Sequence, residues 1–475
     1  FLGGHRDDRE ASGILANLFW TPREDMEFRL RVLAERVRDG SQRLSALPSN
    51  LNPAALTTDI FKVNSNFAGE TALERYQLSL HGRRDFDWGT LKSITSYQNW
   101  ELDPSTVDLD LSSAGFAEST STIMQEQTYI TQELRFESPE DEGPLAWRAG
   151  VFFSDKDTEG DATRTFPFVP GSEQTLFDIE ETNVAAYGRM TFDATDRLTF
   201  EAGGRVDYYD TDMWRSSSLA GMTRLSGDDT YFSPSSGVRY AVNDQVTVYA
   251  TTGIGIKPAG FSAFSNNPLG ASFDEEEAWA NEIGVDVRGA NDDWSFAVRG
   301  FWNEIDDYQL NRSVPGTTDF IVANADEVTS KGVEAEFRWR PIEQLVIQAA
   351  VGIQDTEFDS YREGMTSYNG NTVPFTPEFT ASGGFRYDLP CGWFFGSTAR
   401  LVGDTYYEAG NDSAFKQDDY VVVDAQFGYE REDLRVTLYG RNLLDEEYYS
   451  FINDQIQAGS PGDPQIFGVK VDLSF

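Results

Sequence analysis

Cysteine and histidine are nearly missing from this 475-residue chain, which holds one cysteine and two histidines. A single cysteine excludes a disulfide framework, a zinc site with several cysteines and an iron–sulfur cluster. His5 and His81 lack the spacing of metal ligands and leave little for a histidine-dependent active site, and no Gly-x-Ser-x-Gly motif is present. We therefore expect no enzyme, no cofactor and no bound metal.

Positive charge is also scarce. The chain has 38 Lys and Arg residues against 79 Asp and Glu residues, a net charge of −41. This balance argues against nucleic acid as a partner, because phosphates are bound by Lys and Arg. Aromatic residues make up 13% of the chain, which is too many for a disordered acidic protein.

Long apolar runs are absent too, and none approaches the ~18 residues of a membrane-spanning helix. A transmembrane strand needs only alternate apolar residues, so a membrane protein made of strands remains open. The chain starts Phe1-Leu2-Gly3-Gly4, with no initiator Met, no apolar signal region and no cleavage site. We expect an exported protein to have these, and therefore expect this sequence to lack its beginning.

Apolar and polar residues alternate with a period of two in many stretches of the chain. In the stretch 332–339, Val333, Ala335, Phe337 and Trp339 alternate with charged residues, and the stretches from Leu198 and from Trp294 repeat the pattern. Strand side chains alternate between faces, so each stretch predicts a strand with one apolar and one polar side. About 19 such segments occur, many of about 10–13 residues, which suits tilted strands that cross a bilayer.

The connections between these segments alternate between short and long. Nine short ones are rich in turn residues and lie at 21–25, 85–89, 138–144, 193–196, 242–244, 289–293, 340–343, 388–392 and 430–433. Nine long polar ones lie at about 38–69, 102–123, 157–179, 211–229, 257–276, 307–326, 357–375, 404–419 and 445–465. This order predicts an all-β, antiparallel up-and-down transmembrane barrel with turns at one end and loops at the other. A Greek-key sandwich or a propeller would not keep it.

The C-terminal part resembles one known family. The run Tyr439–Tyr449, with Asn442, Leu443 and Asp445, and then Phe467 and the terminal Phe475, resembles the last hairpin of TonB-dependent outer-membrane receptors. Three further stretches are similar to other elements of that family in the same order: Gln132–Arg135, Gly255–Phe261 and Asn324–Glu334. Ala259 stands where that family often has Gly.

The resemblance implies a barrel of about 22 strands around an N-terminal plug. The first predicted strand, near Ile14–Trp20, ends in a short turn, and such strands carry even numbers in the family. With 19 strands and Phe475 closing the last one, this strand would be number four. We therefore expect residues 1–475 to form the C-terminal part of the barrel, with the plug and the first strands outside it.

The resemblance also implies a function. It points to a multi-pass barrel in the outer membrane of a Gram-negative bacterium. Its expected role is energy-dependent uptake of a scarce ligand, first of all a ferric siderophore. The expected partners are outer-membrane lipid and the TonB–ExbB–ExbD complex, reached through the absent N-terminal region, with the receptor a monomer. Cobalamin, haem or carbohydrate receptors of the same family, a passive porin, a barrel hydrolase and a soluble β protein are the alternatives.

Aromatic and cationic residues in the long loops are the candidate ligand contacts. Aromatic walls with a few cations suit a bulky, anionic or aromatic ferric chelate, although aromatic residues also line membrane interfaces. The candidates are Lys257, Phe261, Phe264, Tyr308, Arg312, Tyr406, Tyr407, Tyr448 and Tyr449.

Other motifs are weaker. Asp155–Gly160 begins like a calcium loop, but Phe166 stands where the bidentate Glu belongs. Gly253–Pro258 lacks the features of a nucleotide-binding loop, and Cys391 lies alone in a turn. The acidic runs 274–277 and 445–447 are expected to be solvated loop surface, with a role in holding divalent ions near lipopolysaccharide as the alternative.

Overall fold

The computed structural model describes residues 8–40, 43–114, 119–139, 143–165, 172–266, 270–314 and 320–474, and nineteen of its strands form one sheet. These strands are β1 (Arg9–Arg23), β2 (Met26–Gly40), β4 (Glu70–Phe86), β5 (Gly89–Asp108), β6 (Thr120–Glu137), β7 (Leu145–Thr165), β8 (Ser172–Thr195), β9 (Leu198–Ser217), β10 (Gly221–Asn243), β11 (Val246–Lys257), β14 (Glu276–Arg288), β15 (Trp294–Ser313), β16 (Phe320–Ile342), β17 (Leu345–Ser360), β20 (Phe379–Asp388), β21 (Trp393–Val402), β24 (Tyr420–Arg431), β25 (Leu434–Arg441) and β28 (Ile466–Leu473). Each pairs antiparallel with the next one along the chain, which confirms the predicted up-and-down order.

Small pieces of structure decorate the end where the loops lie. They are the pairs β12 (Gly260–Phe261) with β13 (Ser272–Phe273), β18 (Arg362–Glu363) with β19 (Thr366–Ser367) and β22 (Thr405–Tyr406) with β23 (Lys416–Gln417), the short helix η2 (Ser413–Phe415), and a sheet of β3 (Ser45–Ala46), β26 (Tyr449–Asn453) and β27 (Ala458–Pro461). Among the described residues, no helix has the length and the apolar content needed to span a membrane.

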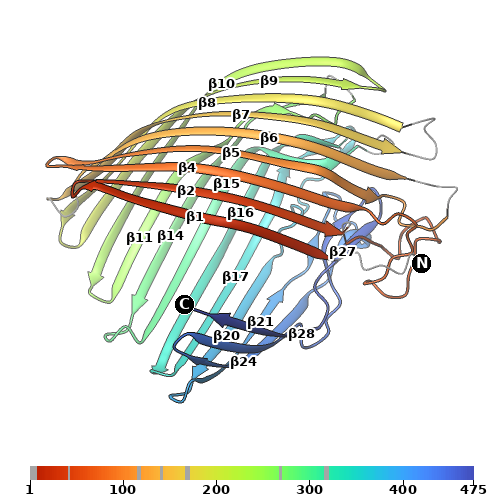
Figure 1. Ribbon diagram of the computed structural model, residues 1–475. Helices are drawn as coiled ribbons and strands as arrows, with labels where there is room; N and C mark the ends of the chain where they lie inside the picture. The colour runs from red at the N-terminus through yellow and green to blue at the C-terminus, as the bar shows by residue number, and fades with distance from the viewer. Residues whose placement is uncertain are drawn as a thin grey trace.

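The large sheet curls into a barrel-like wall with two free edges, β1 and β28 (Figure 1). β1 runs into the short turn before β2, and β28 leaves the loop end and also runs toward the short turns. The two edge strands therefore point in the same direction. Antiparallel pairing between them would need an odd number of intervening strands.

The two faces of the wall differ in chemistry. Val151, Ile283 and Val333 alternate with polar neighbours and share one face through the strand register, and their side chains are 50–66% exposed. An apolar face of this kind is stable only against lipid, so we call it the outer face. The opposite, inner face carries ion pairs such as Arg299 with Glu336, whose atoms lie 2.9 Å apart.

Aromatic rings gather on the outer face next to the short turns. Trp88 stacks on Phe136 with ring centroids 6.0 Å apart, and Trp393 stacks on Phe427 at 5.0 Å. Trp20 and Phe28 form a third pair at 5.4 Å. Rings with an apolar body prefer the boundary between lipid and water, so this belt marks one membrane interface.

Several strands are longer than the alternation predicts. The expected loop 211–229 is instead a tight turn between β9 and β10, whose residues pair from Ser217 with Gly221 onward. Most of 157–179 likewise belongs to β7 and β8. Alternation marks only the part of a strand that faces lipid on one side, whereas backbone pairing continues beyond it.

The wall is consequently uneven in height. Strands β7 to β10 have 20 to 24 residues, whereas β20, β21, β25 and β28 have 8 to 10. Because a membrane crossing needs about 9–11 residues, the first group extends well past the bilayer on the loop side. The last strands barely cross it.

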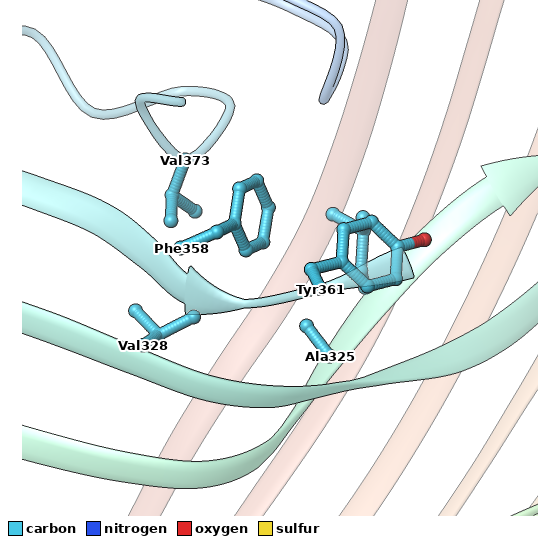
Figure 2. Packing of buried hydrophobic residues seen from close by; sticks show 6 residues of the cluster. Ala325, Val328, Phe358, Tyr361 and Val373 are labelled. Carbon is cyan, nitrogen blue, oxygen red and sulfur yellow. The ribbon is translucent and has the colours of Figure 1, made fainter. Parts of the chain in front are cut away.

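The compact hydrophobic packing lies in the loops, since the wall turns its apolar side chains outward. In Figure 2, Phe358, Tyr361 and Val373 pack against Ala325 and Val328, and all five are almost fully buried. This cluster joins the ends of β16 and β17 to the segment before β20. It holds these loops together as one unit.

The facing of the wall can be tested by substitution. Phe337→Arg or Val298→Arg should destabilise the protein by about 2–4 kcal/mol, because a cation would enter the lipid-facing band. The inner-face change Glu336→Gln should cost at most about 1 kcal/mol, since the Glu336 side chain is 59% exposed and the amide can still accept a hydrogen bond from Arg299. Unfolding in lipid vesicles measures all three, and equal losses would contradict the assigned facing.

Candidate functional site

At the loop end, the first and last described loops meet. Ala46 of β3 pairs with Ala458 of β27, and Arg43 lies 2.9 Å from Asp463. The side-chain amide of Asn50 donates to the backbone oxygens of Ile456 and Gln457. These contacts join the loop after β2 to the loop before β28. The two loops therefore contact each other on the side of the barrel where the edge strands β1 and β28 do not pair.

Asn442 supports the last of these loops from within. It is 1% exposed, and its amide nitrogen donates to the backbone oxygens of Glu446 and Asp463, each at 2.9 Å. Its side-chain oxygen accepts from the Glu446 backbone nitrogen. The adjacent Leu443 donates its backbone nitrogen to Val423. The motif that carries the family resemblance therefore shapes the loop that leads into β28.

The other residues of that motif have different surroundings. Asp445 has a positive φ of 53° and donates its backbone nitrogen to Asn442, so it forms the turn itself. Phe467 lies on the outer face of β28 and is 68% exposed. Phe475 lies outside the described residues.

Three of the predicted ligand residues are used for packing between loops. Phe264 meets Phe177 edge to face at 5.4 Å, and Phe261 packs against the same cluster. Tyr308 is half-buried against the cluster shown in Figure 2. These rings stabilise the loops, which is a role that composition cannot separate from ligand contact.

The remaining aromatic candidates lie in the loops between the short strands, two before β24 and two before β28. Tyr448 stacks on Tyr420 with centroids 4.1 Å apart, and the hydroxyl of Tyr407 donates to the backbone oxygen of Tyr449. Lys416 lies 5.9 Å from the ring centre of Tyr406. The contacts of Tyr407 and Tyr448 join the segment that leads into β24 to the loop before β28.

The two cationic candidates differ in exposure. Arg312 forms an ion pair with Glu363 at 2.9 Å and is mostly covered. Lys257 ends β11 on the inner face, 4.0 Å from Glu276, with 57% of its side chain exposed. Lys257 is the candidate cation best placed to meet a ligand at the mouth.

One group of aromatic residues was not predicted from the sequence. Phe375 contacts Tyr407 at 5.1 Å and lies parallel to Phe451 at 6.0 Å, so three loops contribute one ring each. Phe375 has a φ of 67°, which is rare for a bulky residue, and its backbone nitrogen donates to Tyr406. Neither Phe375 nor Phe451 has a sequence pattern that separates it from other loop aromatics.

Three carboxylates also come together where the sequence analysis found no metal site. Asp157, Glu159 and Asp178 each place an oxygen within 4.8 Å of the others. They lie on the outer face of β7 and β8, above the apolar band. Asp178 comes from the neighbouring strand, so spacing along the chain could not reveal the group. Such oxygens can hold a divalent cation, but exposed acidic groups of this kind are common without one.

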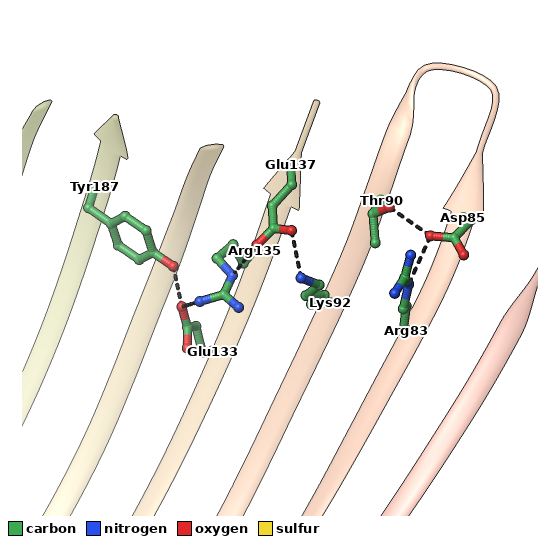
Figure 3. Close-up of polar contacts among 8 residues, drawn as sticks. All are labelled: Arg83, Asp85, Thr90, Lys92, Glu133, Arg135, Glu137 and Tyr187. Atoms are coloured by element: carbon green, nitrogen blue, oxygen red, sulfur yellow. Dashed lines mark hydrogen bonds and ion pairs between the residues drawn. The ribbon is translucent and has the colours of Figure 1, made fainter. Parts of the chain in front are cut away.

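The inner face near the short turns carries a polar network over β4 to β8 that consists of two separate groups. Figure 3 shows its members, which are Arg83, Asp85, Thr90, Lys92, Glu133, Arg135, Glu137 and Tyr187. Lys92 lies 2.6 Å from Glu137, and Arg135 lies 2.9 Å from the same carboxylate. Each charged residue drawn in Figure 3 has an oppositely charged partner there.

Burial shifts the ionisation of the mouth tyrosines. It raises the pKa of Tyr407 to about 12. Burial also raises the pKa of Tyr361, with a further contribution from its hydrogen bond to Glu363. Both side chains are therefore neutral hydrogen-bond donors at ordinary pH.

The raised pKa of Tyr407 predicts that the loop 404–419 loses stability at high pH. A free tyrosine ionises near pH ~10, so the folded loops hold this proton more tightly than the unfolded chain does. Their stability should be constant below that pH and should fall as the pH rises toward the folded pKa of about 12. Hydrogen exchange of the loop 404–419 would measure this. In a Tyr407→Phe variant the decline should be smaller.

Removing the Asn442 amide should weaken the loop before β28. Asn442→Ala leaves the backbone groups of Glu446 and Asp463 without their partner, at a cost of about 1–3 kcal/mol. Thermal unfolding measures the loss. Leu444→Ala, at a neighbouring exposed position, is the control, and an equal loss there would contradict this role.

Comparison with known proteins agrees with this geometry. A family model described as TonB dependent receptor-like, beta-barrel, matches residues 18–443. The ferric yersiniabactin uptake receptor FyuA of Yersinia pestis superposes with a TM-score of 0.84 at 20% identity, over 98% of this chain and 71% of that one. The ferric-catecholate import receptor Fiu of E. coli K12 gives 0.79 at 16% identity, over 98% and 75%.

The ferric citrate transporter FecA gives a TM-score of 0.76 at 16% identity, over 99% of this chain and 71% of that one. At these identities the structural likeness concerns the fold, whereas the family match covers most of the chain. Receptors of this family are transporters and not enzymes, lie in the outer membrane of Gram-negative bacteria, bind siderophore-type ligands and interact with TonB. The chain belongs to the TonB-dependent receptors, and residues 18–443 are their β-barrel.

Proposed function

We propose that this protein takes up a ferric siderophore across the outer membrane, with energy supplied through TonB. The observation that carries the proposal is the family match over residues 18–443, together with the ferric-chelate uptake named for several proteins of the same fold. A barrel of this size is wide enough to need a plug and a gated passage.

The loop end supplies a fitting capture surface. Lys257 provides an exposed cation at the inner rim, and Phe375, Tyr407 and Phe451 provide a group of rings. A ferric chelate is bulky and carries anionic or aromatic groups, which pair with such residues. The candidates Phe261, Phe264, Tyr308, Arg312, Tyr406, Tyr448 and Tyr449 would act mainly by holding the loops in place.

We further propose that additional strands and a plug complete the receptor. The edges β1 and β28 carry unpaired backbone groups, and a bilayer offers no water to satisfy them. Both edges run in the same direction, so an odd number of strands must lie between them. Three would give a barrel of about 22 strands. In this proposal the complete receptor is a monomer and meets the TonB–ExbB–ExbD complex through its N-terminal region.

The proposal predicts an iron phenotype. Cells that carry the complete receptor as their sole siderophore receptor should accumulate radioactive iron from a ferric chelate and grow under iron limitation. The probes are ferric tris-catecholate, ferric hydroxamate and ferric citrate, with cobalamin, haem, copper and maltodextrin as alternative cargoes. Uptake should stop when the proton gradient is dissipated. Uptake that survives dissipation would indicate a passive porin, and uptake of only an alternative cargo would reassign the ligand.

A charge at the mouth should matter for an anionic chelate. Lys257→Gln should weaken binding of the transported chelate by roughly tenfold or more, since a charge-assisted hydrogen bond is lost. Lys62→Gln is the matched control, because Lys62 is equally exposed and pairs with Asp59 in another loop. Surface binding at low temperature measures both, and equal effects would remove Lys257 from the site.

A further inference from the structure

The outer face of the wall changes from apolar to acidic above the membrane. On β7 the apolar positions of this face end at Phe153, and Asp155, Asp157, Glu159 and Asp161 follow on the same face. Asp161 lies ~26 Å further along the strand than Phe153, at ~3.3 Å per residue. Acyl chains do not extend that far, so this part of the wall meets water and the molecules at the cell surface.

Carboxylates oppose one another across four neighbouring strands in this region. Glu101 of β5 lies directly opposite Glu126 of β6. Glu126 in turn lies opposite Glu159 of β7, and Glu159 lies opposite Asp178 of β8. We call these four residues the acidic row. Like charges in directly opposed positions destabilise a sheet, so the acidic row opposes folding.

The charges of the acidic row are not balanced by nearby cations. Among the described residues, none of the ion pairs includes a carboxylate of this row. Burial and the charge of Asp178 raise the pKa of the neighbouring Asp157, and the charge of Asp178 also raises the pKa of Glu180. A positively charged partner would relieve this repulsion, so the surface favours one.

A groove with apolar side chains lies at the acidic row. Its volume is about 470 Å³, and Met124, Leu176 and Trp214 line it together with the carboxylates of the row. Met124 and Leu176 are exposed and both lie opposite Asp161, on the two strands that flank β7. Trp214 lies opposite Asp178. Because lipid does not cover these side chains, a partner must bring its own apolar group to remove them from water.

The position of the groove makes it independent of the parts of the receptor that lie outside residues 1–475. Strands β5 to β9 each have a neighbour on both sides in the sheet (Figure 1). The groove also lies on the outer face, so a plug inside the barrel leaves it unchanged. Neither the free edges nor the interior of the barrel decides its shape.

We propose that the outer wall of β5 to β9 above the membrane docks a basic, amphipathic peptide segment of another protein. Lysine or arginine side chains of that segment pair with the acidic row, and an apolar side chain between them enters the groove of Met124, Leu176 and Trp214. Phosphates of lipopolysaccharide are anionic and are repelled by the row, whereas a metal ion alone would leave the apolar side chains uncovered. The inference does not depend on which ligand the receptor transports.

Binding of a defined peptide tests the docking surface. The probe is a dye-labelled peptide in which one leucine and one phenylalanine are flanked by three lysines on each side. The complete receptor in phosphatidylcholine nanodiscs should bind it saturably in about 0.15 M salt, as measured by fluorescence anisotropy. In a Glu159→Gln/Asp178→Asn variant, binding should weaken by roughly tenfold or more, because close charge pairs are lost. These amides also remove like-charge repulsion, so the variant should fold at least as well as wild type.

A second variant tests the apolar anchor. Leu176→Ser should weaken peptide binding by roughly fivefold, because the apolar contact is lost. Met124→Ser makes the same test if Leu176→Ser does not assemble. The matched control for charge is Glu304→Gln/Asp306→Asn, which removes two exposed carboxylates from the outer face of β15. Charges at this distance are screened by salt, so the control should bind the peptide like wild type.

Each outcome decides for or against the docking surface. An equal loss in the Glu304→Gln/Asp306→Asn control would mean attraction by the overall negative charge and would overturn the proposal. Binding that Leu176→Ser and Met124→Ser leave unchanged would overturn it as well. If wild type binds no peptide, the proposal is wrong, and calcium binding that is lost in Glu159→Gln/Asp178→Asn would then identify a divalent-cation site. The uptake experiment is separate, because peptide binding and transport are measured independently.

Discussion

The structure depends on one constraint, which is that a bilayer satisfies no backbone hydrogen bond. Every strand must therefore pair with a neighbour, and every side chain at membrane depth must be apolar on the outer face. The constraint produces the alternation at Val333 and Phe337, the outward rings at Trp88 and Trp393, and the meander of nineteen strands. It also displaces compact hydrophobic packing into the loops, where Phe358 and Val373 are buried.

The same constraint decides how much of the fold could be predicted. Alternation located the membrane part of the strands, and turn residues located the short connections. It failed for β7 to β10 because their upper parts meet water on both faces. There, Asp155 and Asp157 follow Val151 and Phe153 on the outer face although the pairing with β8 continues unbroken. A strand outside the bilayer has no pattern to distinguish it from a polar loop.

The site was harder to predict than the fold, because aromatic residues serve two purposes. Phe264 and Tyr308 matched the expected chemistry of a ligand wall, yet they pack loops together. Phe375 was not among the predicted candidates, because its exposure depends on a positive φ that no local sequence motif predicts. Residues of the inner wall, such as Glu133 and Tyr187, find their partners only on other strands. The motif at Asn442 could be found in the sequence because its residues lie close together along the chain, in Tyr439–Tyr449, although one of its hydrogen bonds reaches Asp463.

The unequal height of the wall has a consequence for what the cell displays. Strands β8 and β10 have 24 and 23 residues, more than twice the 10 and 8 residues of β20 and β28, so the strand ends form a slanted rim. On the tall side, about ten extra residues at ~3.3 Å each carry the hairpins far beyond the headgroups and into the sugar layer. The low side remains near the lipid surface. A large particle such as a bacteriophage or an antibody would therefore meet the β9–β10 hairpin before it meets the ends of the short strands.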